Sequence, residues 1–124
     1  MKNHHARKNQ PVVVYDIKAK CLDLENFSGF FARRKKNRLY ESIMGDISRR
    51  VLDVFDTVET FTYGMTGEGF HILVWTARDG NTIGRIMAFV RSRFEDRVNR
   101  YLDRSGPVWD GSWSCEVIRA GDPG

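Results

Sequence analysis

The sequence is short of cysteine and proline and has no long apolar segment, and each shortage excludes a class of protein. Its 124 residues include two cysteines and three prolines. Cys21 and Cys115 lack the close spacing of a metal-binding cysteine cluster, so such a cluster is excluded and two buried free thiols are expected. No apolar run approaches the ~20 residues that span a membrane, and no signal peptide is recognisable. We therefore expect a cytoplasmic protein with no membrane contact.

Composition and charge predict a folded domain with a negatively charged partner. Apolar residues make up 41% of the chain and the formal net charge is +4, which is typical of a globular domain rather than of a disordered chain. We expect a flexible basic arm at 1–10, a single domain at 11–120 and a loose C-terminal end at 121–124. The excess of basic residues favours a polyanionic partner.

Hydrophobic periodicity predicts alternating strands and helices. Runs that alternate apolar and polar residues predict strands, and apolar residues three and four apart predict helices. The expected elements are a strand at 12–21, a helix at 33–56, a hairpin of strands at 58–66 and 70–76, a helix at 83–103, and a last strand after the turn at 110–111. The order β-α-β-β-α-β predicts an α+β, ferredoxin-like fold, an antiparallel sheet with two helices packed on it.

The third predicted strand has a core face and an opposite face. Side chains alternate along a strand, so His71, Leu73 and Trp75 point away from the core. The residues assigned to the core are Phe70, Ile72 and Val74 on this strand and Val90, Phe94, Val98 and Tyr101 on the second helix. A lone histidine such as His71 is either satisfied at the end of its strand or a ligand, and both interpretations stay open at this point.

Arginines are segregated on the second predicted helix. Arg93, Arg97, Arg100 and Arg104 follow helical spacing and fall in one stripe beside the apolar face. The first helix opens on a basic run from Arg33 to Arg38, which opposes the helix dipole. These patterns favour contact with phosphate groups over an ordinary solvated helix face.

Two tryptophans flank a glycine turn near the end of the chain. Trp109 and Trp113 lie on either side of Gly111. An aromatic side chain in such a loop either stacks on an unpaired base or closes one end of the core. Both interpretations remain open on sequence alone.

Three features together resemble a family. The hairpin with its strand-borne histidine, the helix FVRSRFEDRVNRYLDRSG and the following GPVWDGSWSCEVI resemble the REP-associated tyrosine transposases, which are single-tyrosine, HUH-type nucleases of single-stranded DNA. The resemblance runs from the first strand to Ile118 and is most specific between Phe89 and Val117. It implies a transposase-like domain that recognises single-stranded or hairpin DNA. The residues then expected to contact DNA are Arg85, Arg93, Arg97, Arg100, Arg104, Arg33, Lys35 and Trp109.

The resemblance also implies a metal site, and this chain departs from it. In that family two histidines, separated by one hydrophobic residue, hold a divalent metal such as Mg²⁺ or Mn²⁺ that polarises the scissile phosphate. By resemblance His71 matches the second histidine, whereas Gly69 stands at the first position. Glu68 offers a carboxylate, although strand alternation aims it away from His71. We therefore expect no bound metal.

The resemblance further implies a nucleophilic tyrosine on a later helix. That helix follows the segment matching SWSCEVI, and the chain has no room for it. The tyrosines that are present lie on earlier elements: Tyr15, Tyr40, Tyr63 and Tyr101. No residue is therefore assigned a catalytic role.

The sequence predicts an inactive, transposase-like DNA-binding domain, with a homodimer as a further expectation. The alternative is a non-catalytic, ferredoxin-like module that binds RNA or protein. The surroundings of His71 discriminate between them. A cleft walled by Arg93 and Arg97 would favour the first, whereas a His71 packed under apolar side chains, with the basic stripe facing away, would favour the second.

Overall fold

The elements follow the predicted order. A computed structural model describes residues 12–29, 32–77 and 82–120, so the basic arm expected at 1–10 and the C-terminal end expected at 121–124 lie outside the described residues. The elements are β1 (Val12–Lys20), the short helix η2 (Glu25–Phe27), α1 (Ala32–Val54), β2 (Val58–Met65), β3 (Gly69–Ala77), α2 (Thr82–Leu102) and β4 (Ser114–Ala120). The predicted bounds of both helices and of the first three strands lie within two residues of the observed ones, and the last strand, predicted to follow the turn at 110–111, begins at Ser114.

The four strands form one antiparallel sheet in the order β2-β3-β1-β4. The inner pair, β1 and β3, is regular along its whole length, from Val12 opposite Ala77 to Lys20 opposite Gly69. Both outer strands are irregular. The register of β2 shifts between Val58 and Thr60, and that of β4 shifts where it meets Val14 and Tyr15 of β1. This topology confirms the ferredoxin-like fold.

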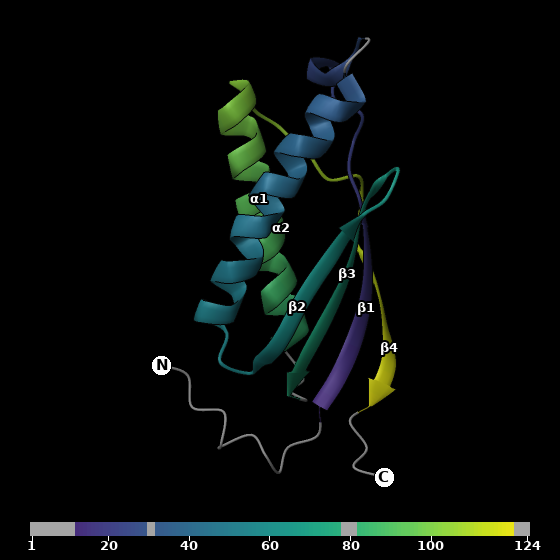
Figure 1. Cartoon of the computed structure of the whole chain (residues 1–124), viewed down its shortest axis with the longest axis vertical. Helices are drawn as coiled ribbons and strands as arrows, with labels where there is room; N and C mark the ends of the chain where they lie inside the picture. The colour runs from purple at the N-terminus through teal and green to yellow at the C-terminus, as the bar shows by residue number, and fades with distance from the viewer. Residues whose placement is uncertain (1–11, 30–31, 78–81, 121–124) are drawn as a thin grey trace.

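Both helices lie on one face of the sheet, and the core fills the space between (Figure 1). Phe70, Ile72 and Val74 are fully buried there, as the alternation of β3 predicts. At the centre, the ring of Phe94 on α2 lies 5.3 Å from that of Phe70 and 4.9 Å from that of Tyr40 on α1. The opposite face of the sheet is uncovered by the described residues and carries His71 and Trp75.

The helices run antiparallel, so the start of α1 lies beside the end of α2 (Figure 1). The second helix ends because Asp103 takes a left-handed conformation, with φ of 52°. The amide of Arg104 then donates to the carbonyl of Asn99 at 2.9 Å, which closes the last turn. Neither helix is long and apolar enough, within the described residues, to span a membrane.

The expectation of two buried thiols is half correct. Cys21 follows β1 and is partly buried, and its burial raises the pKa of the thiol to about 12. Cys115 lies on the outer strand β4 and is exposed. Cys115 is exposed because α1 packs against β2, the outer strand at the other edge of the sheet, and the side chains from Ser114 to Ile118 on β4 are all exposed.

Candidate nucleic-acid interface

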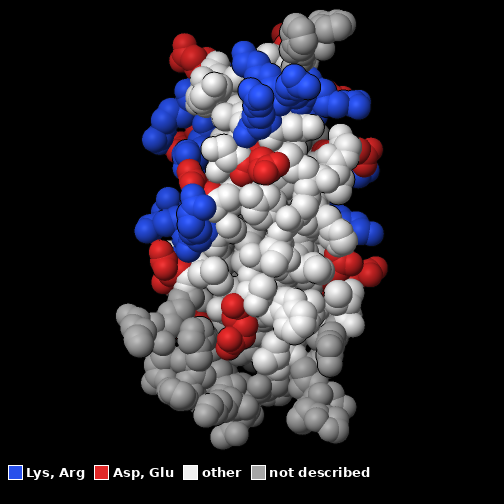
Figure 2. Space-filling view, in the orientation of Figure 1, with Lys and Arg blue, Asp and Glu red and all other residues white. Residues whose placement is uncertain are grey.

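The strongest concentration of positive charge lies where α1 begins. Five of the seven residues from Arg33 to Leu39 are basic. Figure 2 shows lysine and arginine gathered over the upper part of the helical face, where α1 begins and α2 ends. Arg33, Arg34, Lys35 and Arg38 are all exposed, and no side chain among them forms a hydrogen bond or ion pair with any residue that the structure describes. We call these four residues the α1 basic surface.

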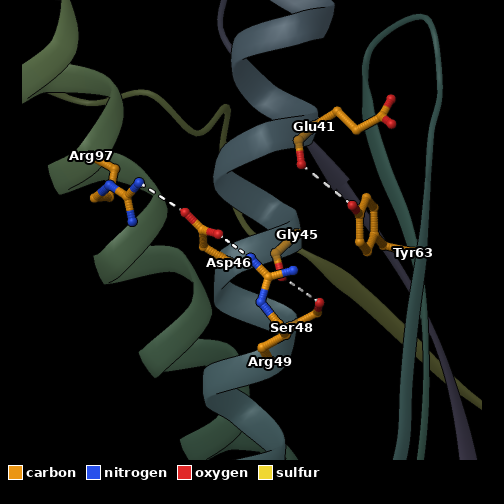
Figure 3. Close-up of polar contacts among 7 residues, drawn as sticks. All are labelled: Glu41, Gly45, Asp46, Ser48, Arg49, Tyr63 and Arg97. Atoms are coloured by element: carbon orange, nitrogen blue, oxygen red, sulfur yellow. Dashed lines mark hydrogen bonds and ion pairs between the residues drawn. The ribbon is translucent and has the colours of Figure 1, made fainter.

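An open groove of about 950 Å³ runs along α1 beside the α1 basic surface. Tyr63 of β2 forms its far wall and donates a hydrogen bond to the carbonyl of Glu41 at 3.3 Å (Figure 3). Gly45 faces this hydroxyl, and a Cβ at position 45 would lie 3.2 Å from the Tyr63 oxygen. The glycine inside the helix therefore lets Tyr63 approach. The residues that line the groove are Arg33, Arg34, Asn37, Arg38, Glu41, Ser42, Gly45, Asp46, Arg49 and Tyr63.

Two arginines of the predicted stripe on α2, Arg97 and Arg100, are paired with carboxylates. Arg97 donates to Asp46 of α1 at 3.1 Å, and the second oxygen of Asp46 accepts from Arg49 (Figure 3). Arg100 donates to Asp96 one turn earlier, at 2.7 Å. These pairs reduce the charge that the stripe presents to a phosphate. The sequence pattern showed the spacing of the arginines but not the Asp46 carboxylate that a neighbouring helix brings to them.

The remaining arginines predicted to contact DNA, Arg85, Arg93 and Arg104, differ in their exposure and in their contacts. Arg93 is exposed and its guanidinium lies 4.7 Å from the centre of the Phe89 ring. Arg85 is exposed near the other end of α2. The prediction that Arg104 continues the stripe is wrong, because the left-handed residue before it ends the helix. Its side chain instead donates to the Asn99 side chain and, at 3.3 Å, to the carbonyl of Pro107.

The structure also corrects the prediction that Trp109 contacts DNA. Its side chain is only 6% exposed, and the ring lies 4.8 Å from that of Phe94 in the core. The indole nitrogen donates to the carbonyl of Arg91 at 3.0 Å. Trp109 therefore closes one end of the core, the other interpretation that its position allowed. Trp113 packs against the same core and is partly buried.

Tyr101, by contrast, is an aromatic side chain that sequence reasoning placed wrongly. It was assigned to the core face of α2, yet it is 66% exposed. Helical spacing gives the angle of a side chain around the axis, but it does not say where the packing partner ends. Val98, one turn earlier, is fully buried, and Leu102, the next residue, is partly buried against the core, so Tyr101 lies at the edge of the core. The proximity of Tyr101 to the end of its helix was the only signal in the sequence.

His71 lies on the open face of the sheet and does not face the arginines. It is exposed, and its Nε2 pairs with the carboxylate of Asp16 on β1. The sequence analysis does not identify Asp16. Its one signal in the sequence is that it is a polar residue within a predicted strand, on the side that faces away from the core. Arg93 and Arg97 belong to the helical layer on the other side of the sheet. No cleft walled by those arginines therefore surrounds His71, nor do apolar side chains cover it.

The position expected to hold a first metal histidine cannot hold a side chain in this structure. A Cβ on Gly69 would lie deep inside the van der Waals radius of the Ala19 carbonyl oxygen and 2.9 Å from the Cα of Lys20. Glu68, the substitute carboxylate, is exposed and pairs with Lys20 at 3.6 Å. Among the described residues, no group of three or more histidine, cysteine, aspartate or glutamate side chains is placed to hold a metal ion.

Comparison with known proteins supports the fold alone. No protein-family model and no curated protein matches the chain. The solution NMR structure of a de novo designed protein with a ferredoxin fold is similar, with a TM-score of 0.51 and 14% sequence identity. The similarity covers 91% of this chain and 89% of the designed one. The chain therefore has a ferredoxin-like fold, and its function must be argued from its own surface.

Proposed function

We propose that the chain is a transposase-like DNA-binding domain that holds single-stranded or hairpin DNA by its phosphates without cutting it. The observation that carries this proposal is the α1 basic surface: Arg33, Arg34, Lys35 and Arg38 are exposed and have no anionic partner among the described residues. DNA is the first nucleic acid to test because of the resemblance to the single-tyrosine transposases.

The α1 basic surface is electrostatically unfavourable in the absence of a ligand. Arg34 and Arg38 are one helical turn apart, and like charges at this spacing repel each other. Arg33, Arg34 and Lys35 also lie in the first turn of α1, where the helix dipole favours negative charge. A phosphate backbone would relieve both effects and would release its condensed counterions on binding. The experiment should therefore measure how the affinity for DNA depends on salt concentration.

The double variant Arg34→Ala/Arg38→Ala should weaken binding to a single-stranded oligonucleotide and flatten its dependence on salt. Each phosphate contact contributes about 0.7 to the slope of log K against log salt on single strands, so the loss of two should reduce the slope by about 1.4. Fluorescence anisotropy titrations across a range of salt concentrations give both quantities. The matched control is Lys18→Ala/Lys20→Ala, which removes the same charge from the opposite face of the sheet. An unchanged slope in the first variant, or an equal loss in the control, would contradict the proposal.

We expect no strand cleavage and no covalent protein–DNA adduct when the chain is incubated with a hairpin oligonucleotide and Mg²⁺ or Mn²⁺. Tyr101 is the only exposed tyrosine of the four, and it lies in the helical layer, whereas His71 lies on the other face of the sheet. A nucleophile and a metal-bound phosphate have to meet within a few ångströms for attack. A denaturing gel would reveal an adduct as a shifted band, and its appearance would show that the domain is an enzyme.

A second candidate is a non-catalytic module that binds RNA or protein through the open face of the sheet. Trp75 favours it, because this side chain is 39% exposed on that face and lies beside the half-buried Leu73. The helices that carry the α1 basic surface and the arginine stripe lie on the other face of the sheet. Trp75→Ala would separate the two functions. It should leave DNA binding by the helical face unchanged, and a loss of nucleic-acid binding would move the interface to the sheet.

A further inference from the structure

A second hollow, of about 460 Å³, lies between the start of α1 and the end of α2. Its lining combines three cations with one aromatic ring and, among the described residues, includes no carboxylate: Arg34, Lys35, Arg38, Leu39, Ser42 and Tyr101. The groove along α1 differs in this respect, because Glu41 and Asp46 line it. The two hollows adjoin, since Arg34, Arg38 and Ser42 line both.

Tyr101 contributes the aromatic wall of this hollow. At 66% exposure, it is the most exposed aromatic side chain that the structure describes. An exposed ring has apolar faces that water solvates poorly, and a flat partner would cover them. The other aromatic side chains are less suited to this role at the α1 basic surface. Trp109 is buried in the core, and Trp75 lies on the opposite face of the sheet.

We propose that Tyr101 stacks on an unpaired base of a nucleic acid whose phosphates are held by Arg34 and Arg38. The inference rests on the proposed function and adds to it the feature of the nucleic acid that the site recognises, an unpaired base. Phosphate contacts alone do not distinguish a single strand from a duplex. Inside a duplex, however, each base is stacked between its neighbours and cannot offer its face to Tyr101, whereas an unpaired base can. The hollow thus selects single strands, loops and unpaired ends.

The test compares ligands that differ only in their bases. The ligands are a fluorescently labelled single-stranded DNA, the same strand with its bases replaced by abasic sites, and the matched duplex. The native chain should bind the base-bearing strand most tightly. Tyr101→Ala should weaken binding to that strand about 5- to 150-fold, which is the range that alanine substitution of a stacking aromatic produces. It should leave binding to the abasic strand and to the duplex unchanged, and Tyr101→Phe should keep the native affinity because the ring remains.

Two controls separate a lost contact from a damaged fold. The thermal midpoint of Tyr101→Ala should equal that of the native chain, because the side chain is exposed and contributes little to the core. Trp75→Ala removes an exposed aromatic from the other face and should not change the affinity for the single strand. An RNA strand of the same sequence completes the set. A dependence on Tyr101 with RNA as well as DNA supports stacking on any unpaired base.

The outcomes distinguish this inference from the proposed function. If Arg34→Ala/Arg38→Ala weakens binding while Tyr101→Ala does not, the phosphate contacts hold and the stacking inference is overturned. Equal affinity of the native chain for the abasic and base-bearing strands overturns it in the same way. If no strand binds at all, the proposed function fails and the inference fails with it.

Discussion

Replacing Ile72 by alanine is expected to lower the free energy of unfolding by about 2–5 kcal/mol. Ile72 lies at the middle of β3, is completely buried, and shares the core with Val90 and Phe94 of α2. The substitution removes apolar contacts and leaves a cavity that the surrounding sheet and helices cannot fill, because two hydrogen-bonded strands hold the backbone of β3 in place. Urea denaturation followed by circular dichroism would measure the loss.

The matched control for Ile72 is Val117→Ala on β4, which truncates another β-branched residue. Val117 is 57% exposed, so its loss should change the stability by no more than about 0.5 kcal/mol, as for an ordinary surface substitution. A cost this small at Ile72 would mean that the two faces of β3 are assigned the wrong way round.

Replacing Gly69 by histidine is expected to destabilise the fold by about 3 kcal/mol, near the upper end of the cost of overpacking. The histidine pair of the resembling family would place an imidazole here, but a Cβ at this position collides with the backbone of Ala19 on β1. A backbone carbonyl in a paired strand cannot move aside as a flexible side chain can. The substitution should therefore open the end of the β1–β3 pair rather than build a metal site.

Gly64→His is the matched control for Gly69→His. Gly64 lies opposite His71 on β2, and a Cβ there meets no atom within 4 Å. We expect its stability to stay within about 0.5 kcal/mol of the native value. Chemical denaturation of both variants provides the comparison, with Gly69→Ala as a milder substitution if the histidine variant does not fold. A Gly69→His chain as stable as the native one would contradict this prediction and would show that the backbone of Ala19 can move to make room for a side chain.

The fold could be predicted because its signals are local. Alternation along β3 separates Ile72 and Val74 from His71, and apolar spacing on α2 identifies Phe94 as a core residue. Once the order of strands and helices is known, the ferredoxin-like topology is one of few ways to bury both helix faces against one sheet.

The candidate site could be predicted only in part, because its properties depend on what other elements bring to it. Arg97 is spaced to contact phosphate, but its charge is offset by Asp46 from a different helix. Trp109 follows the last helix in a loop, and only the closed core shows that its ring is buried. Tyr101 has the spacing of a core residue but lies at the edge of the core and is exposed. The outcomes for Arg97 and Trp109 have no local signal, and the only one for Tyr101 is its proximity to the end of the helix.

The irregular registers of the two outer strands have a consequence for how molecules meet in solution. A straight outer strand offers a row of unsatisfied amides and carbonyls to which another chain can add, and this is a route to aggregation. In this sheet the ladder of β2 is interrupted near Val58, and that of β4 is interrupted opposite Val14. Such interruptions bend a strand and increase its twist. Only the interior pair is regular along its whole length, and the interruption in each described outer strand makes that border of the sheet a poorer template for fibril growth.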